Sequence, residues 1–139
     1  MTVLSTGLTV VKASGVPTPT VVSTPPIAQW LKACPSLAGI ETLAYGDTGH
    51  AFTCITAPLS PDDIKTYVWD DAEGQWHARA NWDAVNGVFT RWGARGVCQV
   101  GGQVLVGDYA SGVLSLLDPA TYTDNGGMWI RDRTMPYAS

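Results

Sequence analysis

From residue 39 onward, the sequence is a succession of short runs rich in β-branched and aromatic residues, separated by clusters of Gly, Asp and Asn. Runs of this length and composition are typical of strands joined by tight turns. The clearest turn is Gly101-Gly102, because two glycines allow the positive φ angles that two-residue hairpin loops prefer. The sequence therefore predicts a mainly β, antiparallel fold. We expect strands over residues 41–45, 50–56, 65–69, 75–80, 96–100, 103–107, 113–117 and 128–133.

Residues 1–38 form a different, N-terminal part. Residues 3–11 predict one strand or a broken pair, and the prolines and small polar residues of 13–26 predict an extended connector. One short α-helix should follow, because Thr24 can cap it, Pro25 suits the first helical position and Pro35 ends it. Its apolar face would consist of Ile27, Trp30, Leu31 and Cys34.

Residues 39–139 carry the signature of two β-propeller-like blade units. The pattern of residues 65–80, an apolar strand, an acidic turn and a Trp-centred strand, recurs over 112–133, with Trp76 and Trp129 in equivalent places. A period of about fifty residues is typical of propeller blades. We expect units over 39–80 and 91–133, about two complete blades plus part of a third. Because a propeller ring needs at least about four blades, the chain should belong to a larger propeller or assembly.

Apolar residues at successive positions, 104–106 and 113–117, indicate strands that are covered on both faces. A strand exposed on one face would instead alternate apolar and polar residues. This pattern predicts sheets packed between other sheets.

Charge and cysteine content exclude several classes of protein. The chain of 139 residues has a net charge of −4, and its few basic residues are scattered, which disfavours direct nucleic-acid binding. Its three cysteines, Cys34, Cys54 and Cys98, show no paired spacing and suggest buried thiols made in a reducing compartment. No secretion signal and no apolar run of about 18 residues is present, so we expect neither export nor a membrane span.

Two histidines are candidates for acid–base chemistry. His50 follows Asp47 in a turn, and His77 follows the acidic turn that contains Asp70. Neither has a nucleophile in a recognisable setting, so we expect no enzyme and no catalytic residues. The acidic pairs in turns do not match a calcium loop, and the glycines of residues 93–102 do not match a phosphate cradle. We therefore expect no metal and no cofactor. A hydrolase that uses either histidine ranks last among the hypotheses.

Aromatic residues offer another kind of site. Most of the Trp and Tyr residues are expected to pack within and between blades, but Trp82 and Tyr122 fall in loops, where exposure would suit an interface. The interface candidates are Trp82, Tyr122, Trp92 and Tyr137. The alternative function is a carbohydrate- or receptor-binding module that uses exposed aromatic residues, in which the substitution Trp82→Ala would abolish glycan binding.

Several segments together carry a family resemblance, in order and spacing, from about residue 21 to residue 139. They are residues 22–27 (VSTPPI), 49–55 (GHAFTCI), 66–70 (TYVWD), 74–79 (GQWHAR), 104–112 (VLVGDYASG), 117–119 (LDP), 122–126 (YTDNG) and 131–133 (RDR). This combination resembles the packaged-DNA stabilisation proteins of short-tailed bacteriophages. The matching residues with a structural role in a blade are His50, Trp69, Asp70, Trp76, Gly107, Asp108, Gly112, Asp118, Asp124, Gly126 and Arg133.

The resemblance implies a structural virion protein, a tail-hub or head-completion factor that helps seal the portal and stabilise packaged DNA. Such proteins are β-propeller-like, sit at the portal vertex after assembly in the host cytoplasm, and act without catalytic residues. The implied partners are other phage tail, adaptor or portal proteins, in a homo-oligomer or a ring completed by further chains, with contacts made through strand addition and aromatic residues. Members of the family are longer, so we expect a fragment, a split product or a shortened homologue.

Overall fold

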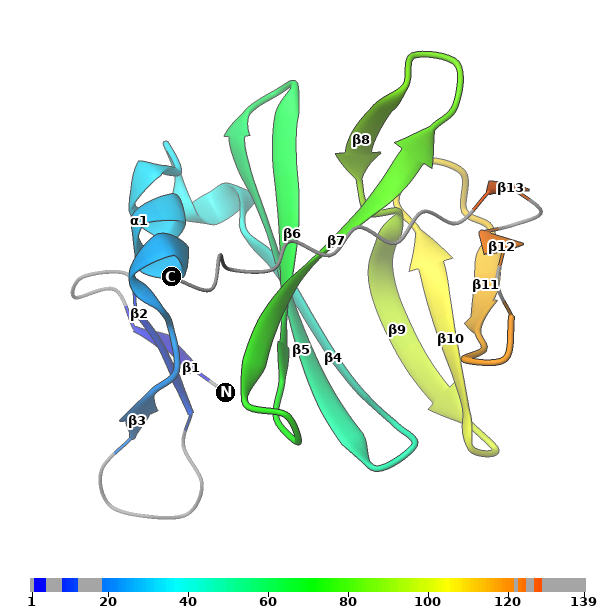
Figure 1. Ribbon diagram of the computed structural model, residues 1–139, viewed down its shortest axis with the longest axis horizontal. Coiled ribbons are helices and arrows are strands. Elements are labelled where there is room, and N and C mark those ends of the chain that lie inside the picture. Colours follow the sequence, from blue (N-terminus) through cyan, green and yellow to red (C-terminus); the bar gives the residue numbers. More distant parts are fainter. Residues whose placement is uncertain (1, 5–8, 13–18, 122, 125–126, 129–139) are drawn as a thin grey trace, which may run out of the picture.

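A computed structural model of the chain describes residues 2–4, 9–12, 19–121, 123–124 and 127–128. Within these residues the protein is mainly β, every strand pairing is antiparallel and there is one α-helix, as the sequence predicted. Its main body has three layers, with a central five-stranded sheet between the N-terminal part and a second sheet (Figure 1).

The N-terminal part combines a small sheet with the helix. Strands β1 (Thr2–Leu4), β2 (Thr9–Lys12) and β3 (Thr20–Val21) form the sheet, and α1 (Pro25–Ala33) and the 3₁₀-helix η1 (Leu37–Gly39) follow. The predicted helix is confirmed: prolines occupy its first two positions, and Ile27, Trp30 and Leu31 are buried. It ends at the extended residue Cys34, because the proline that follows disfavours helical geometry there.

The central sheet has the strand order β4-β5-β6-β7-β8. Its two predicted hairpins are confirmed, and β5 pairs with β6 to join them into one sheet. One strand was not predicted: β7 continues to Asp83, and a further turn leads to β8, which extends this unit to residue 91 instead of 80. The bounds are β4 (Glu41–Asp47), β5 (His50–Ser60), β6 (Asp63–Asp70), β7 (Gln75–Asp83) and β8 (Val88–Arg91).

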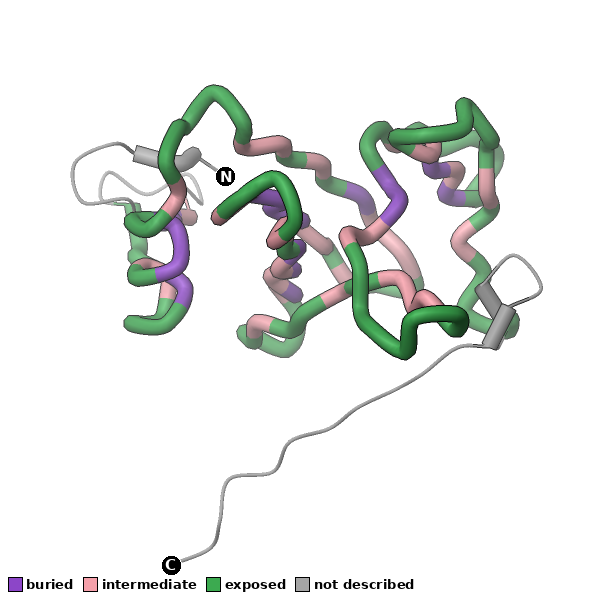
Figure 2. The backbone as a smooth tube through the Cα atoms, turned by 90° about the horizontal axis from the view of Figure 1, so that it is seen from above, coloured by how far each residue is buried: buried purple, intermediate pink, exposed green. Residues whose placement is uncertain are grey.

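Both faces of the central sheet are covered, which explains why four successive residues of β5, 54–57, are all buried (Figure 2). On one face, Ile55 packs with Leu31 of α1 and Val10 of β2. On the other face, Cys54 and its cross-strand neighbour Val68 pack against the second sheet. Because neighbouring side chains of a strand point to opposite faces, covering both faces buries consecutive positions. The one polar residue of this run, Thr56, is hydrogen-bonded through its hydroxyl to that of Thr66 at 2.8 Å.

The second sheet contains β9 (Ala94–Val100), β10 (Gln103–Asp108) and β11 (Leu114–Leu117). The predicted hairpin at Gly101-Gly102 is confirmed, and both glycines have positive φ. Val104 and Val106 face the central sheet and are buried. The expectation that these strands would be covered on both faces is not met within the described residues, because Leu114 is 69% exposed on the outer face.

The last described elements are β12 (Thr123–Asp124) and β13 (Gly127–Met128), which pair with each other. Of the strand predicted over 128–133, only Met128 is described. The central and second sheets, one of five strands and one of three, are consistent with propeller-like blades. Tyr122, Gly126, Trp129, Arg133 and Tyr137 lie outside the described residues.

Candidate functional site

Three turns of the two larger sheets share one geometry, D-x-x-x-G, at residues 70–74, 83–87 and 108–112. In each, the Asp carboxylate accepts hydrogen bonds from the backbone N–H groups two and three residues ahead, and the glycine has a φ between 65° and 68°. Asp118 makes a related turn, accepting from Ala120 N and Thr121 Oγ1. Asp70, Asp108, Gly112 and Asp118 are therefore turn-forming residues. Sequence reasoning missed Asp83 and Gly87, although they carry the same local signal.

His50 is paired with Asp70 and not with its sequence neighbour Asp47. Its Nδ1 atom lies 2.8 Å from Asp70 Oδ2, and its ring stacks on Phe52 with 5.6 Å between centroids. Burial opposes ionisation of Asp70, but the bond to His50 and two backbone N–H groups outweigh it, so the pKa of this carboxyl lies below its usual value. The pair ties the β4–β5 turn to the β6–β7 turn.

His77 also contacts Phe52: the two rings lie edge to face, with 6.2 Å between their centroids. Burial, followed by the positive charge of Arg79, lowers the pKa of His77, and Asp70 opposes this only in part. The nearest thiol on this face, Cys54, is buried, and burial raises its pKa to about 11. A thiol that stays protonated at neutral pH is a poor nucleophile, and the contacts of the two histidines with Phe52 are those of packed rings.

Charged residues also connect the two larger sheets. Glu41 at the start of β4 pairs with Arg91 at 2.5 Å and with Arg95 at 3.5 Å. The guanidinium of Arg91 in turn lies 4.3 Å from the ring centroid of Tyr109. These contacts fix the linker between β8 and β9 against both sheets. Within the part of the chain that the structure describes, no group of three or more His, Cys, Asp or Glu residues could hold a metal.

The two described interface candidates differ in their surroundings. Trp82 packs edge to face on Phe89 at the β7–β8 hairpin, where Phe89 is 52% exposed. Both tryptophans are half-buried, and Trp82 lies in strand β7 and not in the predicted loop. Trp92 lies in the linker, against Arg79 and the core cluster between the sheets. Trp82 thus belongs to a surface hairpin, and Trp92 contributes to packing.

Two surface features remain without an internal partner in the described chain. The first is the outer face of β9–β11, defined as Cys98, Val100, Leu105, Leu114 and Leu116, which the strand register places on the side away from the central sheet. It contains no charged residue, and three of its residues are exposed by 46–69%.

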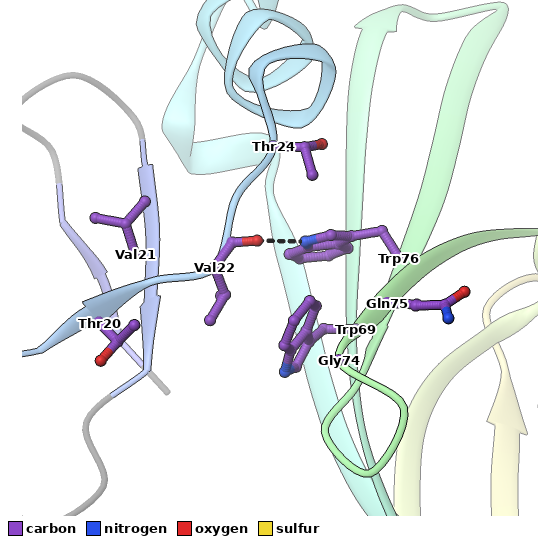
Figure 3. A pocket seen from close by; sticks show the side chains of 8 residues that line it. All are labelled: Thr20, Val21, Val22, Thr24, Trp69, Gly74, Gln75 and Trp76. Atoms are coloured by element: carbon purple, nitrogen blue, oxygen red, sulfur yellow. Dashed lines mark hydrogen bonds between the residues drawn. The ribbon is translucent and has the colours of Figure 1, made fainter.

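The second feature is a groove of about 580 Å³ between β3 and the β6–β7 hairpin. Trp69 and Trp76 of the hairpin face Val22 across it (Figure 3). The sequence predicts that both tryptophans pack within a blade. It does not predict the groove, because the groove forms only where the N-terminal part meets the central sheet.

Comparison with known proteins finds no relative of the chain. No protein-family model matches the chain, and neither the curated proteins nor the solved structures contain a match. Among the described residues, no helix is both long and apolar enough to span a bilayer.

Proposed function

We propose that the chain is a structural protein of a bacteriophage virion, a tail-hub or head-completion factor that works by assembly. The observation that carries the proposal is the uncovered outer face of β9–β11. The resemblance to packaged-DNA stabilisation proteins supports the same role, since such a protein seals the portal through rigid contacts with neighbours.

The outer face has the chemistry of a surface that is meant to be covered. Apart from Gln103, which the register places on the same face, its side chains are apolar on all three strands, and the opposite face of the same sheet is packed on the central sheet. Exposed apolar surface that continues over several strands marks an interface with another protein. We infer that a further sheet, from another copy or a neighbouring virion protein, stacks on this face about 10 Å away, as propeller-like blades do.

Assembly can be measured on the isolated chain by sedimentation velocity over a range of protein concentrations. We expect self-association, and we expect the double variant Leu114→Lys/Leu116→Lys to abolish it, because two charges would be buried unpaired. Val85→Lys is the matched control, since Val85 is 92% exposed on the β7–β8 turn. A chain that stays monomeric at every concentration, or association that the double variant leaves intact, would contradict assembly through this face.

The virion role needs a separate test in a phage that carries this gene. Mass spectrometry of purified particles should detect the chain, and particles assembled without it should lose their packaged DNA. If the purified particles lack the chain, or if particles without it retain their DNA as well as wild type, the proposal is wrong.

A further inference from the structure

The groove between β3 and the β6–β7 hairpin combines two indole rings with neutral polar groups. The centroids of Trp69 and Trp76 lie 5.5 Å apart, with their planes inclined by 51°. The volume, about 580 Å³, falls within the range of small-ligand sites. Its lining consists of Thr20, Val21, Val22, Thr24, Trp69, Gly74, Gln75 and Trp76 (Figure 3).

Both indoles are held in place by their own N–H groups. Trp76 Nε1 donates to the carbonyl oxygen of Val22 at 2.8 Å, and Trp69 Nε1 donates to Asp71 Oδ1 at 3.4 Å. Each ring is therefore oriented before any ligand arrives, and what it offers to a ligand is apolar surface. A fixed aromatic platform binds with little loss of side-chain entropy.

Hydrogen-bonding groups at the rim are uncommitted. The side chains of Thr20 and Thr24 are exposed, and neither forms a hydrogen bond within the described part of the chain. The Gln75 side chain lies on the opposite face of β7 from Trp76 and points away from the groove (Figure 3). The two hydroxyls can each both donate and accept hydrogen bonds. They match a ligand that carries several hydroxyl groups.

The lining of the groove is uncharged. Next to it, Lys12 Nζ pairs with Asp71 Oδ1 at 2.5 Å, and Glu73, which precedes Gly74, adds a negative charge. A nucleic-acid strand could stack its bases on the indoles, but its phosphates require cationic side chains that this lining lacks.

From this arrangement we propose that the groove is a binding site for a neutral saccharide, with the apolar face of a sugar ring packed on Trp69 and Trp76 and its hydroxyls bonded to Thr20 and Thr24. The site goes beyond the assembly role and does not depend on it. It also differs from the site expected at Trp82, which lies on another hairpin and does not line this groove.

The test is isothermal titration of the full chain with three neutral tetrasaccharides: cellotetraose, maltotetraose and N-acetylated chitotetraose. We expect at least one to bind with a millimolar or tighter dissociation constant. Trp69→Ala should weaken that binding at least tenfold. Thr20→Val, which keeps the β-branched shape and removes the hydroxyl, should weaken it about fivefold, as the loss of one hydrogen bond implies, and this exposed site leaves folding intact if Trp69→Ala does not.

Trp82→Ala is the matched control and should bind with unchanged affinity. The Leu114→Lys/Leu116→Lys variant should also bind normally, which separates this proposal from the assembly role. The proposal is overturned if none of the three sugars binds at concentrations up to about 10 mM, or if Thr20→Val leaves the affinity unchanged. Salt-sensitive binding of a single-stranded DNA oligonucleotide at the same residues would also overturn it.

Discussion

The guanidinium carbon of Arg79 lies 5.2 Å from the ring centroid of Trp92, across the boundary between the two larger sheets. The same guanidinium lies 5.6 Å from the ring of Tyr45 and 5.3 Å from that of Phe52, and Arg79 donates a hydrogen bond to the Tyr45 hydroxyl. A planar cation can stack on several aromatic faces at once. Arg79 thus connects β7, β4 and β5 to the linker that leads into the second sheet.

Removing this cation should destabilise the fold. We expect Arg79→Ala to lower the free energy of unfolding by about 2 kcal/mol, because it removes a partly desolvated cation from three aromatic rings. Arg79→Lys should lower the free energy of unfolding by less, because lysine keeps the positive charge and removes only the planar stacking. Urea denaturation measures both values. The control is Arg95→Ala, whose exposed ion pair should contribute under about 1 kcal/mol, and equal losses at both arginines would contradict the role given to Arg79.

The glycine that ends a D-x-x-x-G turn is required by its backbone angle. At Gly112, φ is +68°, and an added Cβ would meet no atom within 4 Å. We therefore expect Gly112→Ala to lower the free energy of unfolding by about 1–2 kcal/mol, through left-handed backbone strain alone. The change is measured as a lower midpoint of urea denaturation. Gly96→Ala is the control, since Gly96 also has open space around its Cβ position but lies in β9 without a positive φ. A loss of stability at Gly96 as large as at Gly112 would show that strain is not the cause.

The turn aspartates should make stability fall in acid. The hydrogen bond from Ser111 and backbone N–H groups lower the pKa of Asp108, and similar bonds lower the pKa of Asp83 and Asp118. In each case the folded pKa lies below the unfolded value of about 3.9, so the unfolded chain binds more protons as the pH falls through this window. Stability should be fully present above about pH 5 and decline below pH 4. Urea midpoints at a series of pH values measure this, and Asp108→Asn should make the decline shallower; a wild-type midpoint independent of pH between 5 and 3 would contradict it.

The three thiols should react in a fixed order. Cys98 is exposed, whereas Cys54 is 1% exposed with a pKa raised to about 11 by burial. Burial also raises the pKa of Cys34, whose Sγ donates to the carbonyl oxygen of Trp30. At pH 8, iodoacetamide should alkylate Cys98 first and Cys54 only after urea unfolding, because the thiolate is the reactive form. Peptide mass spectrometry over time measures the order, and early labelling of Cys54 would mean that the two larger sheets separate in the native state.

Strand β8 shows which features of the fold can be predicted from neighbouring residues alone. Residues 81–91 lack the alternation of apolar and polar residues that marks a strand, so the strand was not predicted. The turn before it could nevertheless be predicted from the sequence, because Asp83 and Gly87 repeat the spacing of Asp70 and Gly74. Turn chemistry acts within five residues, and it therefore remains visible where periodicity fails.

The amino-acid sequence alone determined the helix that begins at Pro25, the hairpin at Gly101-Gly102 and the mainly β character of the chain. Each depends on contacts a few residues apart, through φ restriction, turn geometry or alternation. Only the tertiary structure decided that His50 pairs with Asp70 and that Trp76 reaches the carbonyl of Val22, 54 residues away. Such partners are chosen by which apolar faces are buried together, and this choice is a property of the whole chain that no local pattern contains.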